Sequence, residues 1–573
     1  DGSQDIGHEF GFLSPGAGSE EGTALDFWFS GNTAPVYKNE FSPTTNPNSL
    51  SNSLANSLIS IRNFGIRDSV MKFVVQIGDE RISPLDGYPK FVGKSAGNYS
   101  PQVIQDKVFV SVNDSVFAYT LDGSSATPLS AGLFSAVGGQ FPIAFVRQDG
   151  SDDIFAGVQD SSIIVWTASD LDTDGKYDVI STASIMTSGR ISTSPAIHPS
   201  DFTLFVGDEN GNVTLLRIDS VTAVQKISSE RITSLALNTE IVNPLLSVVA
   251  ITERELIPMA GDSIQLPFSS GQWEVVFGLL PDGMPFFVVS DRGGERVQVY
   301  DGSLSILFSR DFASGANGLS SAALGDIDGD GLRDIVFASG NSLYAFTPYG
   351  TVLDYFPVRV HGNITSDPVI ADLNGDRNPE IIFSTDEKQL VAIDRMGRTL
   401  SEFPLVLDGI NRFTPAAFAS LMANTSVPGI VAVTGNGYVS GWQLKEVPGS
   451  IALPWASYRG NARHTAFENS QLLGDPITTA FFPEQRAYNW PNPVYEDRTN
   501  IRYYVSKDAV VRIKVFDLAG DLVDEFSGPG VGGFDNEVPW DVSNLQSGIY
   551  FARIEASSGA ENGVAIIKIA VVK

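Results

Sequence analysis

Three short acidic loops contain the residue types and the spacing of a metal site. They read DLDTDGKYD at 170–178, DIDGDGLRD at 326–334 and DLNGDRNPE at 372–380. Each places carboxylate or amide oxygens at positions 1, 3, 5 and 9, and position 7 can contribute its backbone carbonyl. Hard oxygen ligands in such numbers suit Ca²⁺ better than zinc or copper. The predicted ligands are Asp170, Asp172, Asp174, Lys176, Asp178, Asp326, Asp328, Asp330, Leu332, Asp334, Asp372, Asn374, Asp376, Asn378 and Glu380.

These loops predict two to three structural calcium ions that replace missing core or neutralise charge. They are not EF-hands, because position 12 holds Ser181, Phe337 and Phe383 where an EF-hand needs a bidentate glutamate. Each loop leads directly into a strand instead. The alternative is a solvated acidic hairpin without metal. The D-x-D-x-D-G-x-x-D pattern resembles the calcium loops of integrin-α-type FG-GAP repeats.

A repeat of 41 to 50 residues must position these loops. One short apolar strand recurs eight times, with anchors at Val116, Ile163, Val213, Leu256, Val297, Leu343, Leu390 and Tyr438. Forty-odd residues is the length of a four-stranded propeller blade. The sequence therefore predicts an all-β fold with a β-propeller over residues 81–467. We expect eight blades, with seven as the alternative because the unit at 227–268 is degenerate.

The loops do not all occupy the same place in the repeat. Loops 326–334 and 372–380 begin 17 and 18 residues before their anchors, so we expect them at equivalent positions of two blades. Loop 170–178 follows its anchor and belongs to a different hairpin. After the last unit, LPWASYRGNARHTAF (453–467) resembles the tail that closes quinoprotein-like and FG-GAP/VCBS propellers.

Composition excludes several classes of function. The chain has 573 residues, enough for about three or four domains, and a formal charge of −30, which disfavours nucleic acid and anionic lipid. It has no run of 18 apolar residues, so no membrane insertion is expected. Zero cysteines exclude disulfides and thiol catalysis. The N-terminus lacks a signal-peptide pattern, so the chain is expected to be cytosolic or already processed.

No catalytic set is visible in the sequence. The string HEFGF at 8–12 lacks the second histidine of a zinc-protease H-E-x-x-H motif, because that position is Phe12. GKSAG at 93–97 satisfies G-x-S-x-G, but no helix follows to form a nucleophile elbow. This chain is therefore not expected to be an enzyme itself.

The last part of the chain changes character. After a linker at 468–486, residues 487–573 alternate apolar and polar positions through about seven short strands, which predicts a small β-sandwich. The order PNP, VFDLAG, W and SGIYFAR resembles the Ig-like module of flagellar-hook-cap proteins and type IX secretion sorting domains. That resemblance implies export across a bacterial outer membrane or docking to a surface component. Because KIAVVK is present, we expect the module to be retained.

Residues 1–80 form another β-rich segment. GTALDFWFSGN (22–32) and ISIRNFGIRDSVMKFVV (59–75) resemble the region that follows the zinc domain of immune inhibitor A-like metallopeptidases. No catalytic residue of that family maps onto this chain. The resemblance implies processing from a metallopeptidase-like precursor.

These observations favour a secreted or cell-surface, calcium-stabilised propeller protein with a non-enzymatic binding or structural role. We expect a protein or glycan partner at the propeller face. Two alternatives remain open, an exosite chain that stays associated with a cleaved zinc protease and a repeating subunit of an extracellular filament or sheath. An extracellular or bacterial cell-surface location is expected.

Overall fold

The structure is a computed structural model, and it divides into two compact units, residues 1–473 and 474–573, each described by itself. Among the described residues, no helix is long and apolar enough to span a membrane. The description leaves out residues 1–27, 34–37, 46–47, 94–99, 105–106, 113–114, 121–143, 150–151, 170–177, 200, 218–219, 241–246, 259–261, 268–272, 294–295, 313–318, 377, 412–416, 421–427, 446–452, 469–480, 483–486, 491, 496, 533 and 560.

The N-terminal part forms a small antiparallel sheet in the order β1-β2-β3. Its strands are β1 (Glu40–Phe41), β2 (Ile59–Arg62) and β3 (Val74–Ile77). Between β1 and β2 the chain runs along the propeller, where Asn56 forms a parallel bridge with Leu405. The N-terminal sheet is thus attached to the propeller through its own connecting segment.

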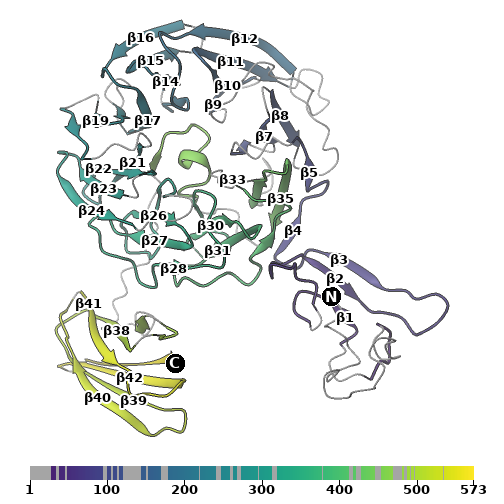
Figure 1. The fold of residues 1–573 in the computed structure, drawn as a ribbon, viewed down its shortest axis with the longest axis vertical. Coiled ribbons are helices and arrows are strands. Elements are labelled where there is room, and N and C mark those ends of the chain that lie inside the picture. The colour runs from purple at the N-terminus through teal and green to yellow at the C-terminus, as the bar shows by residue number, and fades with distance from the viewer. Residues whose placement is uncertain are drawn as a thin grey trace. The chain divides into compact units, whose positions relative to one another are not determined.

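The rest of the first unit is a ring of antiparallel sheets (Figure 1). The described residues form eight such sheets. The first three are β6 (Gln102–Ile104), β7 (Lys107–Val112) and β8 (Ser115–Thr120); β9 (Ala144–Asp149), β10 (Asp152–Gln159), β11 (Ser162–Ser169) and β12 (Asp178–Met186); β13 (Ala196–Ile197), β14 (Leu204–Gly207), β15 (Asn212–Arg217) and β16 (Ser220–Lys226).

Five further sheets complete the ring. They are β17 (Ile232–Leu237), β18 (Val248–Thr252), β19 (Glu255–Pro258) and β20 (Ile264–Gln265); β21 (Trp273–Leu279), β22 (Pro285–Asp291), β23 (Arg296–Asp301) and β24 (Ile306–Asp311); β25 (Ala323–Gly325), β26 (Asp334–Ser339), β27 (Ser342–Phe346) and β28 (Val358–Arg359); β29 (Val369–Ala371), β30 (Glu380–Thr385), β31 (Gln389–Ile393) and β32 (Leu405–Val406); β33 (Ala417–Ser420), β34 (Pro428–Val433) and β35 (Tyr438–Leu444) with β4 (Ile82–Pro84) and β5 (Lys90–Phe91).

The repeat in the sequence corresponds to these sheets. Each of the eight anchor residues lies on the third strand of a different sheet, from Val116 on β8 to Tyr438 on β35. The degenerate unit at 227–268 still forms the four-stranded sheet β17–β20, because apolar residues fill β17 and β18. The prediction of an all-β propeller fold is confirmed.

The eighth sheet joins two distant parts of the chain. Its outer strand β4 comes from the N-terminal side of the propeller and pairs with β35, with Ile82 opposite Leu444. Ile82 is fully buried. A strand from the N-terminal side of the propeller therefore completes the last sheet and closes the ring.

Residues 453–468, the axial segment, lie inside the ring, where Figure 1 shows a green coil. This segment contains the 3₁₀ turn η3 (Tyr458–Gly460) and the strand β36 (Phe467–Glu468), which pairs parallel with β21. First strands of several sheets bind it through the backbone. The bonds are Ile197 N–H to Arg463 O, Leu237 N–H to Thr465 O, Phe277 N–H to Ala466 O and Ile370 N–H to Trp455 O. The chain therefore fills its own central channel.

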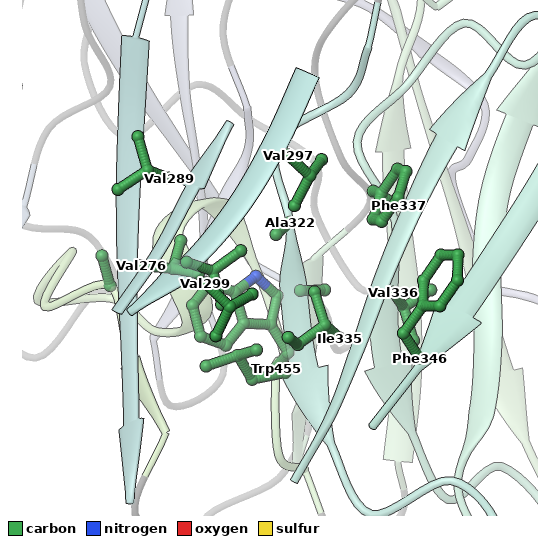
Figure 2. Close-up of a cluster of buried hydrophobic side chains, with 14 of the residues drawn as sticks. Val276, Val289, Val297, Val299, Ala322, Ile335, Val336, Phe337, Phe346 and Trp455 are labelled. Atoms are coloured by element: carbon green, nitrogen blue, oxygen red, sulfur yellow. The ribbon is translucent and has the colours of Figure 1, made fainter. Parts of the chain in front are cut away.

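The core lies between neighbouring blades and around the axial segment. Figure 2 shows valines of β21–β23 beside Trp455, with Ile335, Phe337 and Phe346 of the next blade nearby. Trp455 is only 3% exposed. Its burial places this tryptophan in the core rather than on an exposed aromatic platform.

The described residues of the second unit form a sandwich of seven strands in two sheets, ordered β37-β38-β41 and β40-β39-β42-β43. The strands are β37 (Tyr488–Trp490), β38 (Arg498–Val505), β39 (Val510–Phe516), β40 (Leu522–Gly528), β41 (Phe534–Asp541), β42 (Gly548–Ser558) and β43 (Glu561–Val571). Alternate residues of β38, such as Ile501, Tyr503 and Val505, are fully buried. This period of two places one face of each sheet in a shared core.

Candidate calcium loops

The two loops predicted to be equivalent occupy the same position in adjacent blades. Loop 326–334 connects β25 to β26, and loop 372–380 connects β29 to β30, so each joins the first strand of a sheet to the second. Loop 170–178 instead connects the third and fourth strands, β11 and β12. Its predicted ligands Asp170, Asp172, Asp174 and Lys176 lie outside the described residues, and Asp178 begins β12.

Loop 326–334 is shaped by its own carboxylates. Asp326 accepts hydrogen bonds from the N–H groups of Gly329 (2.8 Å) and Gly331 (3.0 Å). Both glycines have positive φ, 81° and 83°, which residues with a side chain rarely adopt. This left-handed backbone lets the chain wrap around the first aspartate, beside which positions 3 and 9 place their carboxylates.

Three carboxylates converge in this loop. Oxygens of Asp326, Asp328 and Asp334 all lie within 4.8 Å of one another. Asp334 is fully buried, and its Oδ2 accepts the Ile327 N–H at 2.8 Å. Its Oδ1 is also buried but has no hydrogen-bond partner. A buried carboxylate oxygen without a donor is costly unless a cation compensates it.

The electrostatics of the cluster indicate the same need. Burial, reinforced by the charge of Asp330, raises the pKa of Asp326 to about 6. Burial and the same neighbour raise the pKa of Asp328 to about 7. The pKa of Asp334 rises well above its ordinary value, first through burial and then through Asp328. Without a cation, these carboxylates resist ionisation near neutral pH.

The remaining predicted ligands of this loop lie toward its outside. Asp330 is exposed, and its Oδ1 accepts the Leu332 N–H at 2.7 Å. That hydrogen bond fixes the backbone at position 7, whose carbonyl is the predicted ligand. The donor set therefore fits a calcium ion, with Asp326, Asp328 and Asp334 as the residues that would hold it. A bound ion would supply positive charge to this buried site.

Loop 372–380 satisfies its buried carboxylate differently. Glu380 is 1% exposed, and its Oε2 accepts the Leu373 N–H at 2.7 Å. Its Oε1 accepts the side-chain amide of Asn374 at 2.8 Å. Burial still raises the pKa of Glu380 to about 8. The amide at position 3 thus donates a hydrogen bond to the second oxygen of Glu380. In the described structure, Asp334 Oδ1 of the first loop receives no such hydrogen bond.

The outer positions of this second loop stabilise its backbone. Asp372 Oδ1 accepts the Gly375 N–H at 2.7 Å, and Asp376 Oδ1 accepts the Asn378 N–H at 2.8 Å. In the described part of the chain, only the loop at 326–334 brings three acidic side chains close enough to share an ion. The spacing of the two loops is the same, but the hydrogen bonding of their buried carboxylates differs.

Sequence reasoning missed one contact of the first loop. Arg333, at position 8, donates from Nε to the carboxylate of Glu468 in β36 and from Nη1 to the Leu279 carbonyl at 3.0 Å. Glu468 is fully buried. The two residues are 135 positions apart, so no local spacing signals the pair. The loop is thereby connected to the end of the axial segment.

Two family models match parts of the chain. Residues 326–383, which contain both described acidic loops, match the FG-GAP-like repeat. Residues 489–568 match the secretion system C-terminal sorting domain. The C-terminal unit therefore contains a type IX secretion sorting domain, which points to export of this chain to the cell surface.

No curated protein matches the chain. The solved structures similar to this chain include the following three, all at low identity. The biofilm matrix protein Bap1 of V. cholerae has 10% identity and a TM-score of 0.43, over 67% of this chain and 92% of that one. BBS1N in complex with ARL6DN has 13% identity and a TM-score of 0.38, over 64% and 98%. PorZ of Porphyromonas gingivalis has 10% identity and a TM-score of 0.31, over 90% and 68%.

Proposed function

We propose that this chain is a non-enzymatic surface protein whose propeller is stabilised by calcium and serves a binding or structural role. The observation that carries the calcium proposal is the buried Asp334 Oδ1, which accepts no hydrogen bond. This oxygen lies close to the carboxylates of Asp326 and Asp328. A divalent cation there would neutralise Asp326, Asp328 and Asp334 together. The ion would act as a staple between the first two strands of its blade.

The test compares one substitution in each loop. Asp328→Asn gives the first loop the amide that the second loop has in Asn374, so it removes charge without adding bulk. We expect calcium affinity to fall about tenfold or more, because affinity follows the number of charged ligands. The reverse substitution Asn374→Asp should raise the calcium affinity of the second loop. Isothermal titration of the chelator-treated chain measures both.

A matched control lies in another hairpin. Asp282 Oδ1 accepts the Met284 N–H at 2.9 Å, a bond that Asn can also accept, so Asp282→Asn should leave calcium binding unchanged. In the unsubstituted chain, calcium at a hundredfold excess over Kd should raise the free energy of unfolding by about 2.7 kcal/mol per site. A melting temperature insensitive to calcium would contradict the proposal.

The binding role concerns the rim of the propeller rather than its channel. Because the axial segment occupies the ring's interior, a protein or glycan partner would contact the exposed loops at a propeller face. Binding to immobilised surface glycans or to surface extracts, with and without calcium, tests this part. If the chain binds none of these surfaces, the binding role is contradicted and the structural role is the one that stands.

We also propose that the N-terminal sheet derives from a metallopeptidase-like precursor, on the sequence resemblance of residues 1–80. In that case a separately cleaved zinc protease could retain this chain as an exosite subunit. Intact-mass analysis of the native particle decides between the two arrangements. A second chain that binds zinc would support the exosite role, and its absence would leave the chain acting alone.

A further inference from the structure

The β2–β3 hairpin, residues 59–77, forms an arm with one apolar face; Figure 1 draws it in purple. The register sets Ile59 opposite Ile77 and Ile61 opposite Val75. Side chains opposite one another in an antiparallel pair share a face. These four residues therefore form one continuous apolar surface.

This apolar surface is exposed. On this face Ile59, Val75 and Ile77 are 41%, 54% and 62% exposed, and Ile61 is partly buried. Val74 on the opposite face and Ile66, Val70 and Phe73 between the two strands are more than half exposed as well. β3 is the last strand of its sheet, and no described strand pairs with its outer edge. Exposed apolar surface beside an unpaired strand edge is typical of a protein interaction site.

The charge of the arm distinguishes it from the rest of the chain. Residues 59–77 contain Arg62, Arg67 and Lys72 against Asp68 alone, a net charge of +2 (three basic minus one acidic) in a chain of −30. The partner of the arm should therefore be acidic as well as apolar.

The C-terminal sandwich of the same chain offers such a surface on β40. β40 is the outer strand of its sheet and pairs only with β39 among the described strands. Leu518, in the turn before β40, and Leu522, the first residue of β40, are 75% and 54% exposed. Residues 517–525 contain four acidic residues and no basic one.

Neighbouring residues neutralise only part of this charge. Arg512 and Lys514 of β39 lie 3.6 and 3.9 Å from Glu525. Asp524 accepts a hydrogen bond from the Trp540 indole at 3.0 Å, and Asp521 and Asp517 belong to the preceding turn. Four carboxylates against two cations leave an excess of two negative charges. Counted in the same way, the arm keeps an excess of one positive charge (three basic residues against Asp68 and Glu40), because Arg62 lies 3.0 Å from Glu40 of β1. The two surfaces are therefore of opposite charge.

We propose that the arm of one molecule adds its β3 edge to the β40 edge of a second copy. Main-chain hydrogen bonds would extend the sandwich sheet, and the apolar and charged side chains would fix the register. The two surfaces differ, so the contact is heterologous and repeats from copy to copy as an open chain. This deepens the proposed structural role by naming a second copy as the partner.

The test uses two blocked variants of the full chain. The arm variant is Val75→Lys with Ile77→Lys, and the edge variant is Leu518→Lys with Leu522→Lys. Sedimentation of the unsubstituted chain should show oligomers that grow with concentration, and each variant alone should be monomeric. An equimolar mixture should give a dimer and nothing larger, since only one intact arm and one intact edge can meet.

A control variant tests whether loss of assembly is specific to the arm and the β40 edge. Val224→Lys with Ile306→Lys changes two residues that are similarly exposed (50% and 56%) on outer blade strands, and it should assemble normally. Unchanged melting temperatures of the two units show that the variants fold. A chain that stays monomeric at every concentration overturns the inference. So does assembly lost by the arm variant but kept by the edge variant, which would indicate arm-to-arm pairing. Assembly uses no metal ligand, so a failed calcium titration leaves this result intact.

Discussion

His464 is a buried ionisable residue at the centre of the ring. It is fully buried in the axial segment, its Nδ1 lies 3.2 Å from the Pro195 carbonyl, and its Nε2 has no partner. Burial, with a smaller contribution from Arg459, lowers its pKa to about 3. The imidazole is therefore neutral in the folded chain, with Nδ1 as the donor.

This predicts an acid-sensitive contribution of His464 to propeller stability. Between pH 6.5 and 3 the unfolded chain binds a proton at His464 that the folded chain does not, so the contribution of this residue to stability falls as pH drops below about 6.5. The loss from this one group is about 1.4 kcal/mol per pH unit in that range. His464→Gln should flatten this part of the profile. Calorimetry of both chains between pH 7 and 5 measures the difference, and parallel profiles would contradict the assignment.

The ligands of the first loop could be predicted from spacing, whereas the difference between the two loops could not. Positions 1, 3 and 9 of D-x-D-x-D-G-x-x-D indicate where Asp326, Asp328 and Asp334 converge. Whether position 3 is a carboxylate or an amide decides if the last residue keeps an unsatisfied oxygen. That outcome depends on hydrogen-bond geometry, which a sequence pattern does not contain.

At the scale of elements, β36 is a strand held by little backbone pairing. It pairs with β21 over two positions only, Phe277 with Phe467 and Gly278 with Glu468. The buried Arg333–Glu468 ion pair supplements that pairing. The end of the axial segment is therefore held by a residue of the acidic loop 326–334.

Removing one partner of the Arg333–Glu468 pair should lower the free energy of unfolding more than replacing both partners with apolar residues. Arg333→Met leaves a buried, uncompensated carboxylate and should destabilise the propeller by about 3–5 kcal/mol. Arg333→Met combined with Glu468→Met should recover most of that loss. Denaturant unfolding gives the free energies, and hydrogen exchange at Phe467 and Glu468 reports on the strand. Additive losses in the double variant would argue against a direct pair.

The sequence repeat predicts where the strands lie along the chain better than it predicts which strands pair. The eight anchors located the third strand of every sheet, since a period near 46 residues is a property of local sequence. The pairing of β4 with β35 joins residues more than 350 positions apart and has no local signature. The axial segment was recognised as a closing tail, but its filling of the channel depends on first strands from several blades.

At the scale of the whole molecule, the two units have separate cores. The sandwich core includes Ile501, Ile513 and Ile554, none of which belongs to the propeller clusters. We therefore expect two calorimetric transitions, because each unit can unfold cooperatively by itself. Calcium should raise only the propeller transition. A single transition that shifts as a whole with calcium would contradict this separation.

The borrowed strand β4 has a consequence for the timing of biogenesis. A chain made from its N-terminus presents β4 early, but the partner strand β35 emerges only at residue 444 and the axial segment at residue 468. Until β35 has been made, β4 has no partner strand and the last blade cannot be completed. The sorting domain at 489–568 follows directly. The ribosome therefore delivers the export address only after every strand needed to finish the propeller has been made.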